Sequence, residues 1–517
     1  MRPRFATSLI FFMLFPAFAC PQSSSAPRAS QAAPPATLRV DSQIVLLDVS
    51  VTDAAGHPVT DLSQDEFRIT ERKIPQTIAS FEPPAAHQLP SDAAGKVVVN
   101  STADLAKIGQ APIDVLILDE LNMNFPDRAY ARTKLIEWLS RQPAVLPQPT
   151  ALMAIDDVDL KLLRDFTQDR DTLLAILKKH TGMVVWRADS NGRTGEMASQ
   201  NMASTLGALE RVSQAMRGVP GRKNVIWVGD GFPSVNMGDV GRTSAEEIQQ
   251  DLRHLSNVML HAHVTLFVIG PALKGYQPVT IETQADSDMA SSGGYDGMMI
   301  AQGGISFAGL APPTGGHAYA GHNDLDAEIG QSVAAGATYY TLSYHPTNPS
   351  NDPKVYRHIQ VEVTRPGLTV QTRDGYFEDP PQLDGAPKIS TQQLAFDLIG
   401  AATSPLVYTD LHLTAERAGH DAFTVHATAK DLTWRDLPDG RRHADIILMA
   451  ACLASNGKLL SRSFATLGSS TDASLAGIAI STAALPMKVA PPPGTARIRF
   501  VVRDLYAGRV GTADVTP

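Results

Sequence analysis

The chain has 517 residues, of which 19% are charged and 43% hydrophobic, and its formal net charge is −9. This length is too great for one hydrophobic core and indicates about three domains of roughly 150 residues each. The acidic balance supplies no polycationic surface, which argues against nucleic acid as a partner.

Residues 1–19 have the pattern of a secretory signal peptide. Arg2 and Arg4 precede an apolar stretch from Leu9 to Phe18, and Ala17-Phe18-Ala19 forms a small-x-small cleavage site. We therefore expect an exported protein, in the periplasm, at the outer envelope or outside the cell. No later segment is apolar over the roughly 18 residues of a membrane span, so we expect no transmembrane span.

The mature chain would begin at Cys20, and Cys452 is the other cysteine of the sequence. Two cysteines are too few for a disulfide framework. Cys20 suits a lipid anchor, although Ala17 stands where bacterial lipoprotein signals usually carry Leu. The alternative is a plain cleaved signal. Residues 20–37, rich in Pro, Ser, Ala and Gln, predict a flexible tether.

A small β unit is expected over residues 38–84, followed by a linker over 85–109. Apolar and polar residues alternate from Ile44 to Thr52, which predicts a half-buried strand, and Asp53-Ala54-Ala55-Gly56 predicts a turn. Ile69, Ile74, Ile78 and Phe81 lie in further short β segments.

Residues 110–378 alternate short apolar runs with helical spacing, which predicts an α/β fold with a Rossmann-like, doubly wound and mostly parallel sheet. Three of the expected helices start at caps: Asp127, Asp169, and a capping box of Ser244 and Glu247. Two more helices are expected at 206–216 and 325–333. The expected strands are 113–118, 151–155, 224–228, 264–269 and, as the last core strand, 338–344.

A second linker is expected over 379–400, and residues 401–517 return to the alternation of strands. Asn456-Gly457 between two apolar runs is a strong hairpin signal. Evenly spaced strands with little helical pattern predict a C-terminal β-sandwich.

Oxygen-bearing side chains gather where two buried strands end. Asp119, Glu120, Asn122 and Asn124 follow the apolar run of the first strand, and Asp230 follows the strand at 224–228. Because ligands bind at the carboxyl ends of strands in an open parallel sheet, these two ends suggest a hard-cation site or its remnant.

Seven collinear segments between residues 46 and 377 carry a resemblance to a known family. They are LLDVSVTDAAGHPVTDL (46–62), DFTQDRDTL (165–173), PGRKNVIWVGDGFP (220–233), TGGHAY (314–319), NDLDAEI (323–329), YYTLSYHP (339–346) and RPGLTVQTRDGYF (365–377). The middle of the chain resembles a von Willebrand factor A (vWA) domain, and the chain as a whole resembles the secreted VWFA-related proteins of acidobacteria. The resemblance implies a Rossmann-like domain between β modules, exported and without enzymatic activity.

The family binds Mg²⁺ through an Asp-x-Ser-x-Ser loop, a Thr from a later loop, and an Asp that opens an Asp-Gly pair. By position, Asp119 matches the first ligand and Asp230 the last, but Leu121 and Met123 occupy the two serine positions and cannot coordinate a hard cation.

The remaining ligands of a rearranged site would be amide and hydroxyl oxygens. Asn122 and Asn124 are shifted by one position and could offer carbonyl oxygens to Mg²⁺ or Ca²⁺, and the Thr ligand is either Thr181 or Thr194. The alternative is that the carboxylates serve only as caps and hydrogen-bond acceptors.

Three other clusters have simpler interpretations. His254, His261 and His263 are expected to be structural, and the basic pair of Gly221-Arg222-Lys223 is expected to start its strand in solvent. Asp156, Asp157 and Asp159 are interpreted as acidic loop residues rather than as an acid/base partner of Asp119. The long loop 271–305, with Met298-Met299, forms either an adaptable partner surface or an insertion without a role.

The first functional hypothesis is a non-enzymatic adhesion or scaffolding protein of the cell envelope that binds a protein partner over the Asp119/Asp230 face, with a degenerate metal-ion-dependent adhesion site. One alternative is a hydrolase that uses the acidic strand ends, although no nucleophile, base and orienting group converge in the sequence. The other is a purely structural envelope component.

Overall fold

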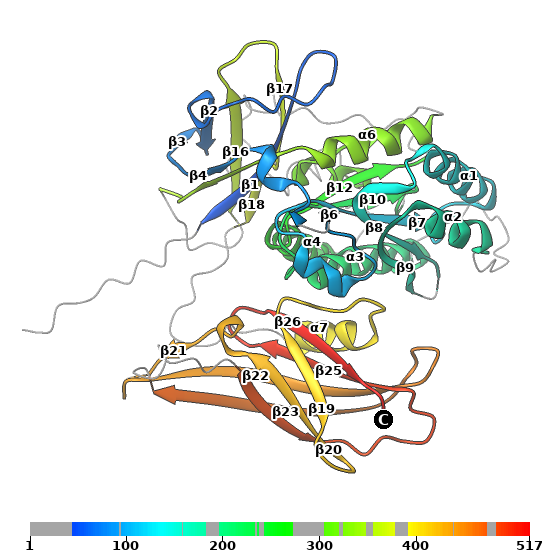
Figure 1. Ribbon diagram of the computed structural model, residues 1–517, viewed down its shortest axis with the longest axis vertical. Helices are drawn as coiled ribbons and strands as arrows, with labels where there is room; N and C mark the ends of the chain where they lie inside the picture. The colour runs from blue at the N-terminus through cyan, green and yellow to red at the C-terminus, as the bar shows by residue number, and fades with distance from the viewer. Residues whose placement is uncertain are drawn as a thin grey trace, which may run out of the picture. The chain divides into compact units, whose positions relative to one another are not determined.

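The computed structural model describes residues 44–92, 95–157, 159–181, 196–232, 235–236, 242–271, 304–319, 324–347, 355–377, 391–437, 439–472 and 482–517 (Figure 1). All of them lie within one compact unit, Gln43–Pro517. The predicted signal peptide and the predicted tether with Cys20 lie outside the described residues, as do Thr194 and loop residues 272–303.

The central element is a six-stranded sheet in the order β14-β12-β10-β7-β8-β9. Its strands pair in parallel except for β8 and β9, which are antiparallel. The mixed α/β class with a mostly parallel sheet is therefore confirmed. The strand bounds are β7 Ile113–Asp119, β8 Val145–Ile155, β9 Leu160–Asp169, β10 Lys223–Val228, β12 Val264–Ile269 and β14 Ala318–Tyr319.

Helices cover both faces of this sheet (Figure 1). Leu116 and Leu118 of β7 share one core with helices α1 Phe125–Arg141, α2 Arg170–Lys179 and α6 Leu325–Ala337. Val115 and Ile117 face the opposite way, into a core with α3 Glu196–Met216 and α4 Arg242–His261. A strand that is buried on both faces favours apolar residues on both of them, which explains the unbroken run from Val115 to Leu118 in β7.

Two small antiparallel sheets contain the N-terminal strands. One has the order β17-β1-β15-β4 and the other β18-β16-β2-β3. Their strands are β1 Val45–Thr52, β2 Phe67–Glu71, β3 Ile74–Gln76, β4 Ile78–Glu82, β15 Tyr340–Tyr344, β16 Tyr356–Val363, β17 Thr369–Gln371 and β18 Gly375–Phe377.

The strand predicted at 338–344 as the last core strand of the central sheet is instead β15, which pairs with β1 and β4. Residues 340–377, predicted as the end of the central domain at 110–378, therefore belong to the N-terminal sheets, because β15–β18 complete those sheets. The physical reason is a shared core: Val45, Leu47 and Val49 alternate on one face and pack with Tyr340, Leu342 and Tyr344.

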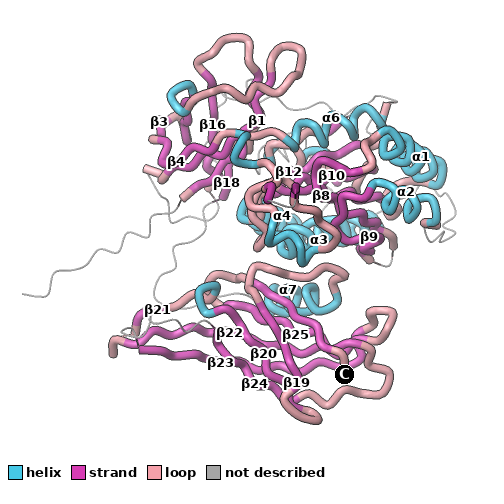
Figure 2. The backbone as a smooth tube through the Cα atoms, viewed as in Figure 1, coloured by secondary structure: helices cyan, strands magenta, loops and turns pink. Residues whose placement is uncertain are grey.

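The C-terminal part is built mainly of strands (Figure 2). One sheet has the order β19-β20-β24, and the other has β21-β22-β25-β26 with β23 paired to β22. Phe423 and Val425 of the first sheet share a core with Ile446, Leu448 and Phe500 of the second. The bounds are β19 Leu413–Arg417, β20 Ala422–Thr428, β21 Arg435–Asp436, β22 Arg441–Leu453, β23 Leu459–Asp472, β24 Thr482–Lys488, β25 Arg497–Asp504 and β26 Val510–Val515.

Several local predictions are decided by these elements. The hairpin at Asn456-Gly457 is confirmed, since it joins β22 to β23 and Gly457 has a φ of 81°. Asp169 caps α2 as expected. The predicted linker 379–400 is wrong in part, because helix α7 Thr391–Thr403 lies there and Asp397 pairs with Arg503 of β25.

Two predicted helix starts are also corrected. Asn124, and not Asp127, caps α1, because its side chain accepts the backbone N–H of Asp127. Helix α4 begins at Arg242, ahead of the expected capping box at Ser244. The remaining strands have two residues each: β5 Ser91–Asp92, β6 Gly95–Lys96, β11 Val235–Asn236 and β13 Gly304–Ile305. Among the described residues, no helix is long and apolar enough to cross a membrane.

Candidate functional site at the strand ends

The two strand ends singled out in the sequence lie side by side. Strands β7 and β10 are parallel neighbours, with Leu118 opposite Val228. Asp119 ends β7, and Gly229, Asp230 and Gly231 follow β10, so the two acidic segments lie at the same edge of the sheet. The expectation that these two ends meet is confirmed.

The carboxylate of Asp119 is fully buried and accepts hydrogen bonds from both strand ends. Oδ1 accepts from the backbone N–H groups of Leu121 (3.1 Å) and Asn122 (2.9 Å) and from the Asn122 side-chain amide (3.2 Å). Oδ2 accepts from the same amide (3.0 Å), from the indole Nε1 of Trp227 (3.0 Å) and from the backbone N–H of Gly231 (2.9 Å). N–H donors thus surround the two oxygens that a cation would need.

Burial has the largest effect on the pKa of Asp119 and raises it, while the N–H groups of Asn122, Trp227 and Gly231 act in the opposite direction. N–H donors satisfy a buried carboxylate, as they do in any well-formed polar core. The chemistry available to this group is therefore to hold the two loops together.

The other expected ligands have separate structural roles. The Asn122 side chain is buried and also donates to Oγ1 of Thr205 at 3.1 Å. Asn124 is exposed at the start of α1, and its amide donates to Asp127 Oδ2 at 2.7 Å. Asp230 is half-buried and its Oδ1 lies against Gly270, at the end of β12. Thr181 is exposed just after α2.

The two residues at the serine positions of the family motif belong to the core. Leu121 packs into the core on the α3/α4 face of the sheet, and Met123 into the core on the α1/α2/α6 face. A loop that inserts two apolar side chains on opposite sides of the sheet end cannot present hydroxyl ligands there. The residues present therefore do not fit the Mg²⁺ site that the resemblance implies.

Two glycines let the β10 end approach Asp119. Gly229 has a φ of 150°, and a Cβ at that position would lie 2.3 Å from the Cβ of Asp119. Gly231 has a φ of 66°, and a Cβ there would lie 2.0 Å from the ring of Phe307. This close approach places the Gly231 N–H on the carboxylate.

The neighbouring acidic groups are engaged within the protein. Glu120 is buried and pairs with Nε2 of His180 at 3.1 Å. Asp156 accepts the backbone N–H of Asp159 at 3.1 Å and pairs with Lys161. These contacts do not produce a nucleophile and a base that face a common space.

The basic pair Arg222-Lys223, expected in solvent, is buried, and that expectation is wrong. Arg222 Nη1 donates to Ser50 Oγ of β1 at 2.8 Å, and Lys223 Nζ donates to the carbonyl oxygen of Gly221 at 2.8 Å. His263 lies 3.4 Å from Asp48 in the same region. Arg222 thus joins the central sheet to the N-terminal strands, whereas Lys223 bonds to the turn that precedes its own strand.

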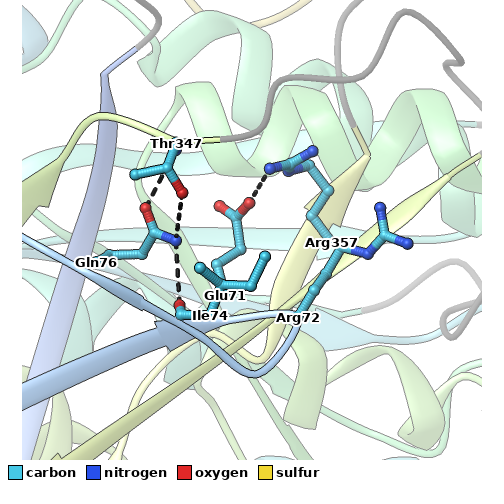
Figure 3. Close-up of a pocket in the computed structure, with 6 residues that line it drawn as sticks. All are labelled: Glu71, Arg72, Ile74, Gln76, Thr347 and Arg357. Carbon is cyan, nitrogen blue, oxygen red and sulfur yellow. Dashed lines mark hydrogen bonds and ion pairs between the residues drawn. The ribbon is translucent and has the colours of Figure 1, made fainter.

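A cavity of about 240 Å³ lies among the N-terminal strands, away from the strand-end site (Figure 3). Glu71 in its lining accepts from Arg357 and from the hydroxyl of Tyr344 (2.6 Å). Gln76 and Thr347 exchange hydrogen bonds on the opposite wall. Because these two pairs bind each other across the strands, we interpret the cavity as part of the β-strand core.

The strand-end face also carries an exposed aromatic side chain. Phe125, the first residue of α1, directly follows the β7 loop and is 63% exposed. Asn124 beside it is exposed as well. An exposed aromatic residue next to a loop that hydrogen bonds hold in place is the kind of anchor that protein interfaces favour.

Sequence reasoning missed Trp227 and Thr205, which complete the Asp119 network. Trp227 sits inside the apolar run of β10, where only its side-chain N–H distinguishes it from a plain core residue. Thr205 lies on α3 and donates back to the carbonyl of Asn201 at 2.7 Å. A polar residue on the buried face of a helix was the signal that could have identified it.

No family model and no curated protein matches the chain. Among solved structures, the chain is similar to proximal thread matrix protein 1 of the mussel byssus, at 14% identity over 31% of this chain and 36% of that chain, with a TM-score of 0.19. It is similar to the ArnB paralog VWA2 from Sulfolobus acidocaldarius at 11% identity over 65% of this chain and 76% of that chain, with a TM-score of 0.23.

The chain is also similar to Bacteroides uniformis β-glucuronidase 2 at 11% identity over 34% of this chain and 18% of that chain, with a TM-score of 0.12. It thus spans little more than a third of the mussel protein and less than a fifth of the glucuronidase. VWA2 is a weak structural neighbour, and TM-scores this low carry no argument about family, activity or partners.

Proposed function

We propose that this chain is an exported, non-enzymatic VWFA-related protein that serves protein–protein adhesion or scaffolding at the cell envelope. Its central sheet would be a Rossmann-like vWA domain, flanked by an N-terminal β unit and a C-terminal β-sandwich. The seven collinear segments, the leader pattern of residues 1–19 and the helix-covered parallel sheet support this proposal.

One observation carries the proposal: the carboxylate of Asp119 is satisfied by N–H donors from both strand ends. The degenerate adhesion site then acts as a structural anchor that needs no metal. It holds the β7 loop so that Asn124 and Phe125 face outward at the start of α1. The partner would be a protein with an apolar pocket for the Phe125 ring.

The hydrolase alternative is less well supported, because the carboxylates of Asp119 and Asp156 each accept hydrogen bonds from groups within the protein. A purely structural envelope component remains the second candidate, since the extensive strands at both ends of the chain could assemble without the strand-end face. The two candidates differ in whether Phe125 matters for binding.

The test compares immobilised wild-type protein with the Phe125→Ala variant in capture from envelope extracts of the source cells, quantified by mass spectrometry. Phe464→Ala is the matched control, because Phe464 lies on β23 and is 53% exposed. We expect partners that wild type and Phe464→Ala retain and Phe125→Ala loses. Equal recovery by all three proteins would remove the strand-end proposal and favour the structural alternative.

A further inference from the structure

Three helices bring a histidine and two carboxylates together at a place that the strand-end proposal does not use. They are Glu210 of α3, His254 of α4 and Asp397 of α7, and one ligand atom from each lies within 4.8 Å of the others. His254 Nε2 and Glu210 Oε1 are 2.9 Å apart. Ligands at 2.0–2.2 Å from one ion in adjacent positions would be about 3 Å apart, so this spacing suits a shared metal.

The amide of Gln393 lies among these three residues. Its Nε2 is 3.3 Å from Glu210 Oε1, 3.4 Å from His254 Nε2 and 2.9 Å from Asp397 Oδ1. The amide of Gln214 approaches from another side, 3.0 Å from Glu210 Oε1 and 3.5 Å from Asp397 Oδ1. The Gln393 N–H₂ group, which is positively polarised, thus lies 2.9–3.4 Å from all three ligand atoms, in the place of a fourth corner of the cluster.

Gln393 could serve the metal-bound state as well. The two ends of an amide group are nearly the same size, so a half-turn of the side-chain amide replaces its nitrogen with an oxygen. That oxygen would be a fourth ligand atom among Glu210, His254 and Asp397.

A second layer of contacts orients Asp397. This residue is 3% exposed, and its Oδ2 accepts from Nε of Arg503 at 2.8 Å, which leaves Oδ1 directed at the cluster. Outer hydrogen bonds that fix the orientation of a ligating carboxylate are a regular part of metal sites.

The cluster is open on one side. The His254 side chain is 40% exposed, whereas those of Glu210 and Asp397 are 13% and 4% exposed. An ion can therefore enter past His254 and meet the more buried carboxylates.

We propose that Glu210, His254 and Asp397 form a binding site for a divalent first-row transition ion, with Gln393 as a further oxygen ligand. One imidazole nitrogen with carboxylate and amide oxygens suits Zn²⁺ and its neighbours better than Ca²⁺, which prefers a set of oxygens alone. The ion clamps α7 onto α3 and α4. Because the ligands are far apart in the sequence, binding stabilises the folded chain over the unfolded one.

The experiment uses the full chain after treatment with a chelator and dialysis. Zn²⁺ is titrated calorimetrically, Co²⁺ is followed by its visible absorption, and Tm is recorded with and without Zn²⁺. The variants are His254→Gln and the isosteric Glu210→Gln. The matched control is His261→Gln, since His261 is an exposed histidine at the end of the same helix.

We expect one equivalent of Zn²⁺ to bind and to raise the Tm of wild type and of His261→Gln. Each cluster variant should weaken Zn²⁺ binding at least ~10-fold and lose the Tm rise. Unchanged Zn²⁺ binding in both cluster variants would place the ion elsewhere and overturn the proposal. So would the absence of Zn²⁺ and Co²⁺ binding by wild type. If His254→Gln fails to fold, Zn²⁺ binding by Glu210→Gln is compared with that by wild type and decides whether the proposal holds.

Discussion

The indole Nε1 of Trp227 donates a hydrogen bond to Oδ2 of Asp119 across 3.0 Å, and both side chains are fully buried. Trp227 belongs to β10 and Asp119 to β7, so this bond joins adjacent strands next to the loops that follow them. Where the resemblance to vWA domains implies a metal ion between loops, this chain places N–H donors.

Replacing Trp227 with Phe should destabilise the protein by about 2–3 kcal/mol. The change removes a hydrogen bond to a buried carboxyl group and some buried volume, while the aromatic contact with Phe307, at 4.7 Å between ring centroids, is largely kept. Urea unfolding at pH 7 measures the loss. A stability within about 0.5 kcal/mol of wild type would mean that the Trp227–Asp119 bond is not formed.

Replacing Asp119 with Asn should cost about 2–4 kcal/mol, because an amide N–H₂ would then face N–H donors that lose their acceptor. Asn124→Ala is the comparison: it removes the cap of α1 and should cost about 1 kcal/mol. Chemical denaturation with and without Mg²⁺ gives both values. Wild-type stability that rises with Mg²⁺, together with a near-neutral Asp119→Asn change, would contradict the anchoring role.

Replacing Gly231 with Ala should be far more costly than the same change at Gly457. Both glycines have positive φ, but a Cβ at Gly231 would lie 2.0 Å from the Phe307 ring, whereas nothing lies within 4 Å of one at Gly457. Gly457→Ala should therefore cost only the backbone strain, about 1 kcal/mol, and Gly231→Ala about 3 kcal/mol or more. Equal losses in thermal unfolding would show that the β10 end does not approach the Phe307 ring closely.

Asp114 should make stability depend on pH. Its carboxylate is buried on β7 and accepts from Nδ2 of Asn224 at 2.9 Å, and burial raises its pKa from 3.8 to about 7. The folded state therefore binds this proton more tightly than the unfolded chain does. The contribution of Asp114 is fully present below about pH 4 and is lost as the pH rises through about 7.

The Asp114→Asn variant removes this titration, so its stability relative to wild type should improve between pH 5 and pH 8 by about 2–3 kcal/mol. Urea unfolding at both pH values measures the difference, with the exposed Asp65→Asn as the control. A difference between wild type and Asp114→Asn that does not change with pH would be the contrary result.

The central sheet, and the edge at which β7 and β10 end, were predictable because they depend on apolar patterns within short segments of the sequence. An unbroken apolar run in β7 indicates a strand buried on both faces, and parallel neighbours must end at the same edge. The cap at Asp169 and the hairpin at Asn456-Gly457 are also local, and both were found.

What the sequence did not reveal depends on contacts between distant segments. Strand β15 has the same apolar pattern whether it joins the central sheet or β1, and only the core that Tyr340 and Leu342 share with Leu47 of β1 decides. Likewise Arg222 resembled a solvent residue, because its partner Ser50 lies 172 residues away. The role of Asp119 could not be assigned until its donors were placed.

Calorimetric titration of Mg²⁺, Mn²⁺ and Ca²⁺ into wild type, Asp230→Ala and His254→Gln tests the metal-independent strand-end face most directly. We predict that Asp230→Ala and wild type give the same isotherms for each ion, since any transition-ion binding belongs to the cluster with His254. An ion that binds wild type and His254→Gln but not Asp230→Ala would contradict this account, because it would place a metal between the ends of β7 and β10.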